Sequence, residues 1–243
     1  MRLTSLLHPY IIYFLDLLFP HLCLGCGAEG EFFCAECART LTYVPPSCVV
    51  CRTLTVEGKR KKWGRTCTPC RKKSAISRFF SPLRYEDARV RKILHMLKYL
   101  RMREGAFTAA QFLSFSFSRF KISFPEEALL LPIPLAKSRE RTRGFNQSAC
   151  IAEEFMRISR SALTLRPDIL LRVRATRSQV GLSQDARKAN MKGAFQITKE
   201  DLVRGKIAIL LDDVKTTGAT LEEAAKTLRA AGAREVWAIT VAH

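Results

Sequence analysis

Eight of the nine cysteines stand in four C-x-x-C pairs within the first seventy residues. Each pair forms a tight knuckle whose sulfurs converge on one ion, and four thiolates make the closed tetrahedral site typical of structural zinc. The segment is poor in apolar residues, so metal binding would supply its folding free energy. We expect two structural zinc ions, with an iron–sulfur cluster or redox-active thiols as alternatives. The expected ligands are Cys23, Cys26, Cys34 and Cys37 for one ion and Cys48, Cys51, Cys67 and Cys70 for the other, with an interleaved pairing as the alternative.

A metal-binding use of the cysteines implies a reducing compartment, so we expect a cytoplasmic protein. The apolar stretch from Leu6 to Leu22 raises the question of a signal peptide or a membrane span. It contains Pro9, Asp16 and Pro20, lacks a small-residue cleavage site and runs directly into Cys23. We therefore expect an amphipathic helix and no membrane span, with association at a membrane surface as the weaker alternative.

The formal charge of +19, with a pI near 10.0, indicates a polyanionic partner or substrate. Nucleic acid and phosphorylated small molecules both fit this charge. Part of it lies between the last two cysteine pairs, where a basic loop also contains Trp63. Such a loop could grip phosphates and stack a base of single-stranded DNA, or it could be a solvated face. The basic residues are Lys59, Arg60, Lys61, Lys62 and Arg65.

The remaining sequence predicts an α/β fold. Short apolar runs at 128–132, 206–211 and 236–241 are typical of strands, and residues 146–158 and 220–231 have helical periodicity, the second ending at Gly232. Strands that alternate with helices imply a parallel sheet with right-handed crossovers. We expect residues 1–74 to hold the N-terminal helix and a double zinc ribbon. Residues 75–243 would form the larger domain, with a basic helical connector (75–127) before the α/β core (128–243).

The most informative segment, 207–220, reads IAILLDDVKTTGAT. An apolar strand delivers Asp212 and Asp213 at its carboxyl end, where α/β folds place ligands, and a turn of small hydroxylated residues then opens a helix. Backbone N–H groups at a helix N-terminus form a cradle for an anion, and Gly218 lets the backbone approach a phosphate closely. The two carboxylates are positioned to accept hydrogen bonds from ribose hydroxyls. The alternative is a capped strand-to-helix turn without a ligand.

The string D-D-V-x-T-T-G-A-T resembles the phosphoribosyl pyrophosphate signature of type I phosphoribosyltransferases. The resemblance implies a parallel-sheet fold of that type in which Asp212 and Asp213 contact the ribose and are the candidate catalytic residues. It further implies that the 5′-phosphate is held by Thr216, Thr217, Gly218, Ala219 and Thr220.

Two further segments resemble the ComF family. L-P-I-P-L at 131–135, followed by arginines and R-G-F-N-Q at 143–147, is similar to the family string that occupies the place of the pyrophosphate loop. The resemblance implies that Arg139, Arg141 and Arg143 bind the pyrophosphate and that magnesium bridges it to the ribose hydroxyls. The segment from Arg172 to Phe195 is similar to the region that would form a mobile flap. Lys215 departs from the family, which commonly carries an uncharged residue there.

The resemblance implies a role in DNA uptake during natural competence, with a phosphoribosyl pyrophosphate-like ligand, single-stranded DNA and a helicase-like competence partner. The alternative function is an active phosphoribosyltransferase that transfers the sugar phosphate to a nitrogen acceptor. No segment identifies a pocket for that acceptor, and no residue stands out as its general base. Fold alone does not decide between these functions.

Overall fold

The computed structural model describes residues 22–55, 63–99, 103–159, 161–174 and 183–243. The expected helix at 6–22 lies, apart from Leu22, outside the described residues. So do Lys59 to Lys62 of the basic loop and residues 175–182 of the expected flap. The chain divides into two compact units, residues 1–41 and 42–243. The second cysteine group therefore belongs to the unit that holds the sheet, and an independent domain ending at residue 74 stays a prediction.

The first unit contains one short helix among its described residues, α2 (Ala35–Arg39). The helix begins at Cys34, whose Sγ accepts a hydrogen bond from the backbone N–H of Cys37. An isolated bridge pairs Leu22 with Glu29 across the first knuckle. The described residues of this unit thus form turns around cysteines, as expected for a segment folded by metal.

The second unit is built on a parallel sheet with the strand order β1-β7-β6-β2-β3. The central strand β6 and its neighbour β2 carry only apolar residues up to the acids of β6, because a parallel sheet is covered on both faces. The register aligns Pro132 of β2 with Leu211 of β6, so both strands end at the same edge. The strands are β1 (Arg78–Phe80), β2 (Leu129–Pro132), β3 (Thr164–Leu165), β6 (Ile207–Val214) and β7 (Glu235–Ala242).

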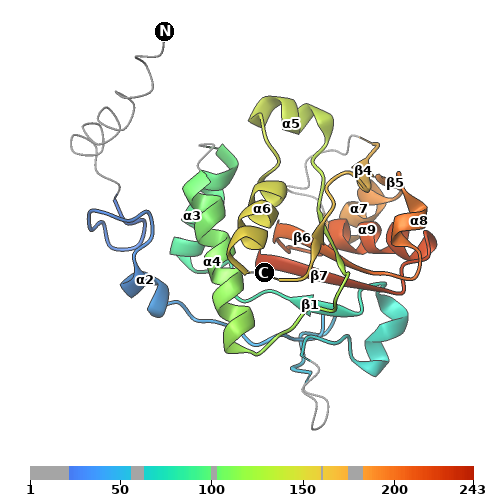
Figure 1. Cartoon of the computed structure of the whole chain (residues 1–243), viewed down its shortest axis with the longest axis horizontal. Helices are drawn as coiled ribbons and strands as arrows, with labels where there is room; N and C mark the ends of the chain where they lie inside the picture. The colour runs from blue at the N-terminus through green and yellow to red at the C-terminus, as the bar shows by residue number, and fades with distance from the viewer. Residues whose placement is uncertain (1–21, 56–62, 100–102, 160, 175–182) are drawn as a thin grey trace. The chain divides into compact units, whose positions relative to one another are not determined.

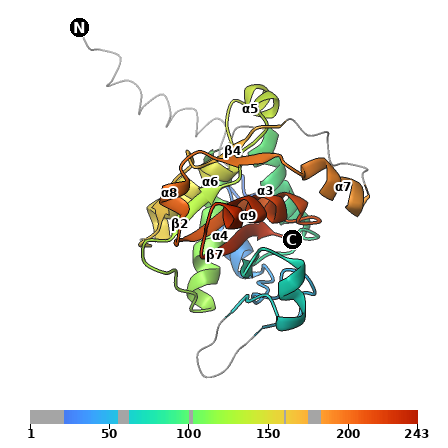
Figure 2. The same cartoon turned by 90° about the vertical axis from the view of Figure 1, so that its right-hand side faces the viewer.

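Helices cover both faces of the sheet (Figure 1). One face is covered by α3 (Ala88–Tyr99), α4 (Arg103–Arg119) and α6 (Gln147–Ser159); the other by α7 (Gln184–Met191), α8 (Glu200–Val203) and α9 (Ala219–Ala230). A separate antiparallel pair, β4 (Leu170–Arg172) with β5 (Phe195–Ile197), lies near α7 and α8 (Figure 2). The helix α5 (Lys137–Arg143) follows β2 before the chain enters α6.

The sequence predictions for the α/β core are confirmed. The expected strands correspond to β2, β6 and β7, the expected helices to α6 and α9, and the strands are parallel. The connector 75–127 is helical in α3 and α4, but it also contributes β1, which the sequence analysis missed. Three residues are too short a run to show a strand periodicity, and only pairing with β7 makes this segment a strand.

The second cysteine group is packed against this sheet. The short helix η1 (Thr68–Lys73) follows Cys67, and residue Arg65 pairs with Arg78 of β1 in an antiparallel bridge. Val49 and Ile76 are buried in the same hydrophobic cluster as Ala219 and Leu221 of α9. The core beneath α9 is thus shared between the sheet and the residues around the second group.

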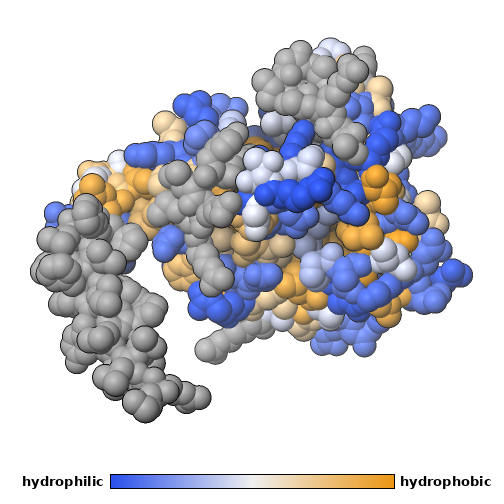
Figure 3. Space-filling view, turned by 90° about the horizontal axis from the view of Figure 1, so that it is seen from above, coloured by the Kyte–Doolittle hydropathy of each residue, from blue (hydrophilic) through white to orange (hydrophobic). Residues whose placement is uncertain are grey.

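No helix in the described part of the chain is long and apolar enough to span a membrane. The face of the molecule seen from the side of α5 is covered largely by hydrophilic side chains, with smaller hydrophobic patches between them (Figure 3).

Candidate functional site

The eight cysteines of the C-x-x-C pairs form two groups of four in sequential order. Within each group the four Sγ atoms lie within 4.8 Å of one another. The Sγ atoms of Cys26 and Cys34 are 3.8 Å apart, and those of Cys51 and Cys67 are 3.6 Å apart. A tetrahedron of sulfurs about 2.3 Å from a central zinc ion has edges of about 3.8 Å. Each donor set therefore fits a tetrahedrally coordinated metal ion.

The thiols of the second group have opposed acidities. Hydrogen bonding with Thr53 lowers the pKa of Cys51 to about 6, whereas hydrogen bonding with Cys67, together with burial, raises the pKa of Cys70 to about 12. Four sulfurs at this distance cannot all ionise unless a cation compensates their charge. A divalent metal ion would supply that charge, so the chemistry of the groups, like their geometry, suits a metal ion.

The second group is joined to the first turn of α9 by one carboxylate. Glu222 accepts a hydrogen bond of 2.6 Å from Ser74 Oγ at Oε2 and one of 2.8 Å from the backbone N–H of Ala75 at Oε1. These two residues immediately follow η1. The position of the second group relative to the α9 N-terminus is therefore fixed by hydrogen bonds as well as by packing.

The predicted phosphate loop lies between β6 and α9. Gly218 is the N-cap of α9 and has a φ of 81°, in the left-handed region that favours glycine. Gly218 has no side chain with which to cap the helix, and Thr217 Oγ1 accepts a long hydrogen bond of 3.5 Å from the backbone N–H of Ala219. The loop thus places a hydroxyl and helix N-terminal N–H groups side by side, an arrangement that suits an anion. Lys215 donates its backbone N–H to the carbonyl of Ala242 at 3.0 Å, which fixes the start of the loop to the end of β7.

The two acids at the end of β6 differ in exposure. Asp213 is only 4% exposed, whereas Asp212 is half-buried. Asp212 Oδ1 accepts hydrogen bonds from Ser148 Oγ at 2.9 Å and from the backbone N–H of Asp213 at 3.0 Å. Ser148 lies at the start of α6 and is fully buried. The sequence analysis missed it, because a serine in a helix carries no signal until the fold brings α6 beside β6.

The segment after β2 is tied to the same edge of the sheet. Asn146 donates from Nδ2 to the carbonyl of Ile133 at 3.0 Å and accepts the N–H of Ser148 at Oδ1. Arg143 donates to Gln147 Oε1 at 3.0 Å from the end of α5. The R-G-F-N-Q string therefore closes the loop that carries the arginines and delivers Ser148 to Asp212.

The structure brings Arg172 of β4 into the same region. Burial lowers the pKa of its guanidinium, with a further lowering by the charge of Arg139 and an opposing effect of Asp212. Its side chain also contacts Met191 Sδ at 3.5 Å and lies over the ring of Phe195. The expected phosphate-binding arginine Arg139, the first acid and Arg172 are thus close enough to affect one another electrostatically. Of the predicted flap, the structure describes residues 172–174 and 183–195.

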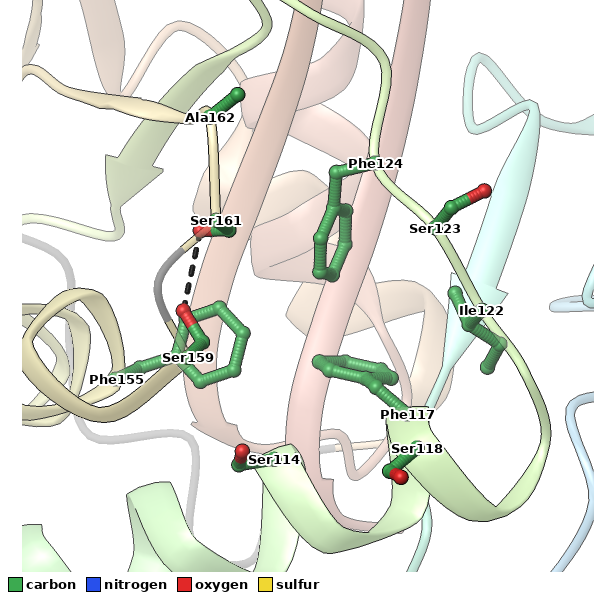
Figure 4. A pocket seen from close by; sticks show the side chains of 10 residues that line it. All are labelled: Ser114, Phe117, Ser118, Ile122, Ser123, Phe124, Phe155, Ser159, Ser161 and Ala162. Carbon is green, nitrogen blue, oxygen red and sulfur yellow. Dashed lines mark hydrogen bonds between the residues drawn. The ribbon is translucent and has the colours of Figure 1, made fainter.

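A cleft of about 610 Å³ opens beside the phosphate loop. One wall consists of the loop from Lys215 to Ala219, and the other comes from Val49, Val50 and Arg52 of the second cysteine group and from Lys73. A smaller cavity of about 320 Å³ lies at the far ends of α4 and α6, lined by Phe117, Phe124 and Phe155 and by serine hydroxyls (Figure 4). No charged side chain lines this second cavity. A third cavity, of about 460 Å³, is lined by Arg204, Lys206 and Arg234 together with Glu126 and Glu127, and it does not include the phosphate loop. The first cleft thus combines cations with the expected phosphate loop.

Comparison with known proteins identifies the family of this chain. The model of the phosphoribosyl transferase domain matches residues 155–243, which include β6, the loop and α9. The "DNA utilization protein YhgH" of Salmonella typhi is 30% identical over 222 residues, covering 90% of this chain and 83% of that protein. The chain belongs to the ComF family. Its parallel sheet is a phosphoribosyltransferase fold with a cysteine-rich segment at its N-terminal end.

Other ComF relatives carry names from DNA competence. "Competence protein F" of Haemophilus influenzae is 28% identical and covers 88% of this chain and 87% of its own. "Competence protein ComFC" of Bacillus subtilis is 27% identical, and the match covers 85% of this chain and 88% of that protein. Among solved structures, the allosteric regulatory enzyme of purine biosynthesis matches 61% of this ComF chain at 20% identity and a TM-score of 0.37. This chain spans 30% of that enzyme's length.

Proposed function

We propose that this ComF protein binds phosphoribosyl pyrophosphate, or a related sugar phosphate, together with magnesium, as part of DNA utilisation. The observation that carries the proposal is the hydrogen bond between Ser148 and Asp212, which joins the start of α6 to the acids at the end of β6. Together with the N-terminus of α9, it gathers carboxylates, arginines and helix N-terminal N–H groups at one edge of the sheet.

Each part of this edge has a chemical role in the proposal. Asp212 and Asp213 would accept hydrogen bonds from the ribose hydroxyls, and the N–H groups and hydroxyls of residues 216–220 would hold the 5′-phosphate. Arg139 and Arg143 would bind the pyrophosphate, because a planar guanidinium matches two phosphate oxygens at once. Magnesium prefers oxygen ligands and would bind with the pyrophosphate, neutralising part of its charge.

The proposal includes two structural zinc ions, one in each cysteine group. Four thiolates form a closed site with no position left for a substrate, so the zinc would act on folding rather than on chemistry. In the second group that folding includes the wall of the cleft beside the phosphate loop. Zinc binding would therefore shape the ligand site of the larger unit.

The DNA role rests on the charge of +19 and on the names of the relatives. We propose single-stranded DNA as a partner, held by basic side chains that include Arg89, Arg91 and Lys92 near the start of α3. Binding through many phosphates should weaken steeply with salt, whereas a small-ligand pocket should respond much less. A cytoplasmic location follows from the zinc assignment. The helicase-like partner stays a prediction from family resemblance.

Catalysis is the second candidate. A transferase would form a bond from an acceptor nitrogen to the anomeric carbon while the bond to pyrophosphate breaks, and the arginines would stabilise the departing anion. The deciding measurement is calorimetric titration with phosphoribosyl pyrophosphate and magnesium, run beside the double variant Asp212→Asn, Asp213→Asn. Binding by the parent protein alone would support the site and justify assays of pyrophosphate release with added acceptors. No binding by the parent protein would contradict the proposed function.

A control variant separates loss of the site from loss of the fold. Asp168 lies in the turn before β4, where it pairs with Arg166 and Lys199. Asp168→Asn removes a carboxylate of the same unit that is not part of the proposed site, so its ligand affinity should stay within about two-fold of the parent's. A comparable loss of binding in this variant would mean that the double variant acts through stability.

A further inference from the structure

The first and second cysteine groups begin with the same knuckle, built on different residues. In the first, the N–H of Gly27 donates to the carbonyl of Cys23 at 2.8 Å, and the N–H of Cys23 donates to Ala28. In the second, the N–H of Arg52 donates to the carbonyl of Cys48 at 2.9 Å, and the N–H of Cys48 donates to Thr53. Arg52 therefore occupies the position that Gly27 occupies in the first knuckle.

This position requires a left-handed backbone. Gly27 has a φ of 78° and Arg52 a φ of 60°. Glycine adopts such angles without steric cost, whereas a residue with a Cβ is strained there. The knuckle geometry alone would favour glycine at both places. Lys121 and Glu127 share this backbone conformation, so the strain alone does not identify a ligand site. At Arg52 the strain coincides with a side chain that lines a cleft, and backbone strain often occurs at ligand sites.

The side chain of Arg52 lines the cleft opposite the phosphate loop. Three other cations line the same cleft: Lys73, Lys215 and Lys226. Within the described residues, none of these four cations forms an ion pair with a carboxylate. The two glutamates of the lining are already engaged, Glu222 with Ser74 and Ala75, and Glu223 with the backbone N–H of Gly193. Because these donors are neutral, both glutamates keep their charge, and the described lining carries four cations against two carboxylates, so it is net positive.

Two of these cations, Lys215 and Arg52, lie close enough to affect one another electrostatically. Lys215 is largely buried, with its ammonium over the ring of Phe79 at 5.4 Å. Burial lowers the pKa of Lys215 and the neighbouring charge of Arg52 lowers it further, while the Cys48 thiolate has a smaller, opposing effect. Like charges repel one another in this way unless an anion lies between them, so the arrangement fits a cleft that is completed by an anionic ligand.

We propose that this cleft is a second phosphate-binding site, in which Arg52 of the cysteine group and the cations of the α9 side bind the phosphate of a small phosphorylated molecule. The proposal rests on the proposed function in one respect, that the adjoining loop holds a sugar phosphate. The volume of about 610 Å³ is in the usual range of small-molecule sites, and Val49, Val50 and Ile76 give it an apolar wall. The phosphate could belong to a second substrate or to the far end of the first ligand.

The test is the variant Arg52→Gly, because it should lower ligand affinity without lowering the stability of the fold. Glycine restores the residue of the first knuckle and removes the backbone strain, so the metal content should be unchanged and Tm unchanged or higher. Two calorimetric titrations distinguish the sources of the phosphate: phosphoribosyl pyrophosphate with magnesium into the free protein, and adenosine monophosphate into the protein saturated with that ligand. At least one affinity should fall about ten-fold or more, because hydrogen bonds between charged groups are among the strongest in proteins.

Two further variants complete the experiment. Lys121→Gly is a matched control, because Lys121 is also a cation with a left-handed backbone, with a φ of 51°, and it does not line the cleft. Its affinities should equal those of the parent. Arg52→Lys should recover part of the lost affinity, since it restores the charge without the bidentate geometry.

The result that overturns the inference is an Arg52→Gly protein that keeps both affinities within about two-fold of the parent's. A variant that loses affinity only for a single-stranded oligonucleotide would also overturn it, in favour of a nucleic-acid surface. If the parent protein binds no phosphoribosyl pyrophosphate, the proposed function fails. The Arg52 site fails as well only if the parent protein also binds no adenosine monophosphate, or binds it no more tightly than the Arg52→Gly variant does.

Discussion

Ser148 at the start of α6 donates a hydrogen bond of 2.9 Å to Asp212 at the end of β6, across 64 residues of sequence. Both residues belong to the edge where the parallel strands end. The bond orients the carboxylate through its Oδ1 atom. Ser148 is therefore a positioning residue for the proposed ribose contact.

Ser148→Ala should weaken binding of phosphoribosyl pyrophosphate about ten-fold, because a hydrogen bond to a charged group contributes roughly 1.5 kcal/mol. The variant should keep its fold, because alanine favours a helix and is close in size to the buried serine that it replaces. Calorimetric titration with magnesium present measures the effect. Ser161→Ala, which removes a hydroxyl that is bonded only to neighbours at the end of α6, should bind like the parent. Equal affinities in both variants would contradict the role of Ser148.

Gly218→Ala should damage the phosphate loop specifically. The substitution places a Cβ at a φ of 81° and within 3.0 Å of Lys215 Cε, so the lysine side chain must move from its position over Phe79. Gly193→Ala carries the same backbone cost, of about 1–2 kcal/mol, at a φ of 67° where the new Cβ meets nothing within 4 Å. Both variants should have a similarly lowered Tm. Only Gly218→Ala should lose ligand affinity, by ten-fold or more, and parallel losses would mean that general stability explains the effect.

The central α/β elements could be predicted from the sequence because their signals are local. The apolar run that ends in Asp212 is continuous, as a doubly covered parallel strand requires, and the helix 220–231 has both a periodic face and a glycine at its end. The grouping of the cysteines is equally local, since each knuckle contributes two sulfurs to one site.

The rest depended on long-range contacts that no local pattern encodes. β1 is a strand only because it pairs with β7, and Ser148 and Arg172 join the site only after α6 and β4 are packed against the sheet. The sequence analysis treated both cysteine groups as one module apart from the larger domain. In the structure, Val49 and Ile76 share a hydrophobic cluster with α9, and the second group lies in the same compact unit as the sheet, while the predicted domain boundary at residue 74 stays a prediction.

Glu222→Ala should loosen the second cysteine group from α9. The substitution leaves Ser74 Oγ and the N–H of Ala75 without their acceptor, at a cost of roughly 2 kcal/mol for two part-buried hydrogen bonds to one carboxylate. Tm should fall by about 4–8 °C in a protein of this size. Zinc should also be lost to a chelator sooner than from the parent. Glu222→Gln keeps one oxygen acceptor, so its Tm should lie between those of Glu222→Ala and the parent. A Tm equal to the parent's in both variants would contradict the role of Glu222.

The two cysteine groups should differ in their effect on ligand binding. Cys48→Ser removes a buried ligand of the group whose Val49 packs with Ala219 and Leu221 of α9, whereas Cys23→Ser acts in the separate unit of residues 1–41. Each variant should lose one of two metal equivalents, measured by elemental analysis. Loss of the second metal should release its packing against α9 and weaken binding of phosphoribosyl pyrophosphate by at least ten-fold, because the wall of the cleft and the loop share one core. Cys23→Ser should leave that affinity within about two-fold of the parent's. The same affinity in Cys48→Ser and Cys23→Ser would mean that the second metal site does not shape the phosphate loop.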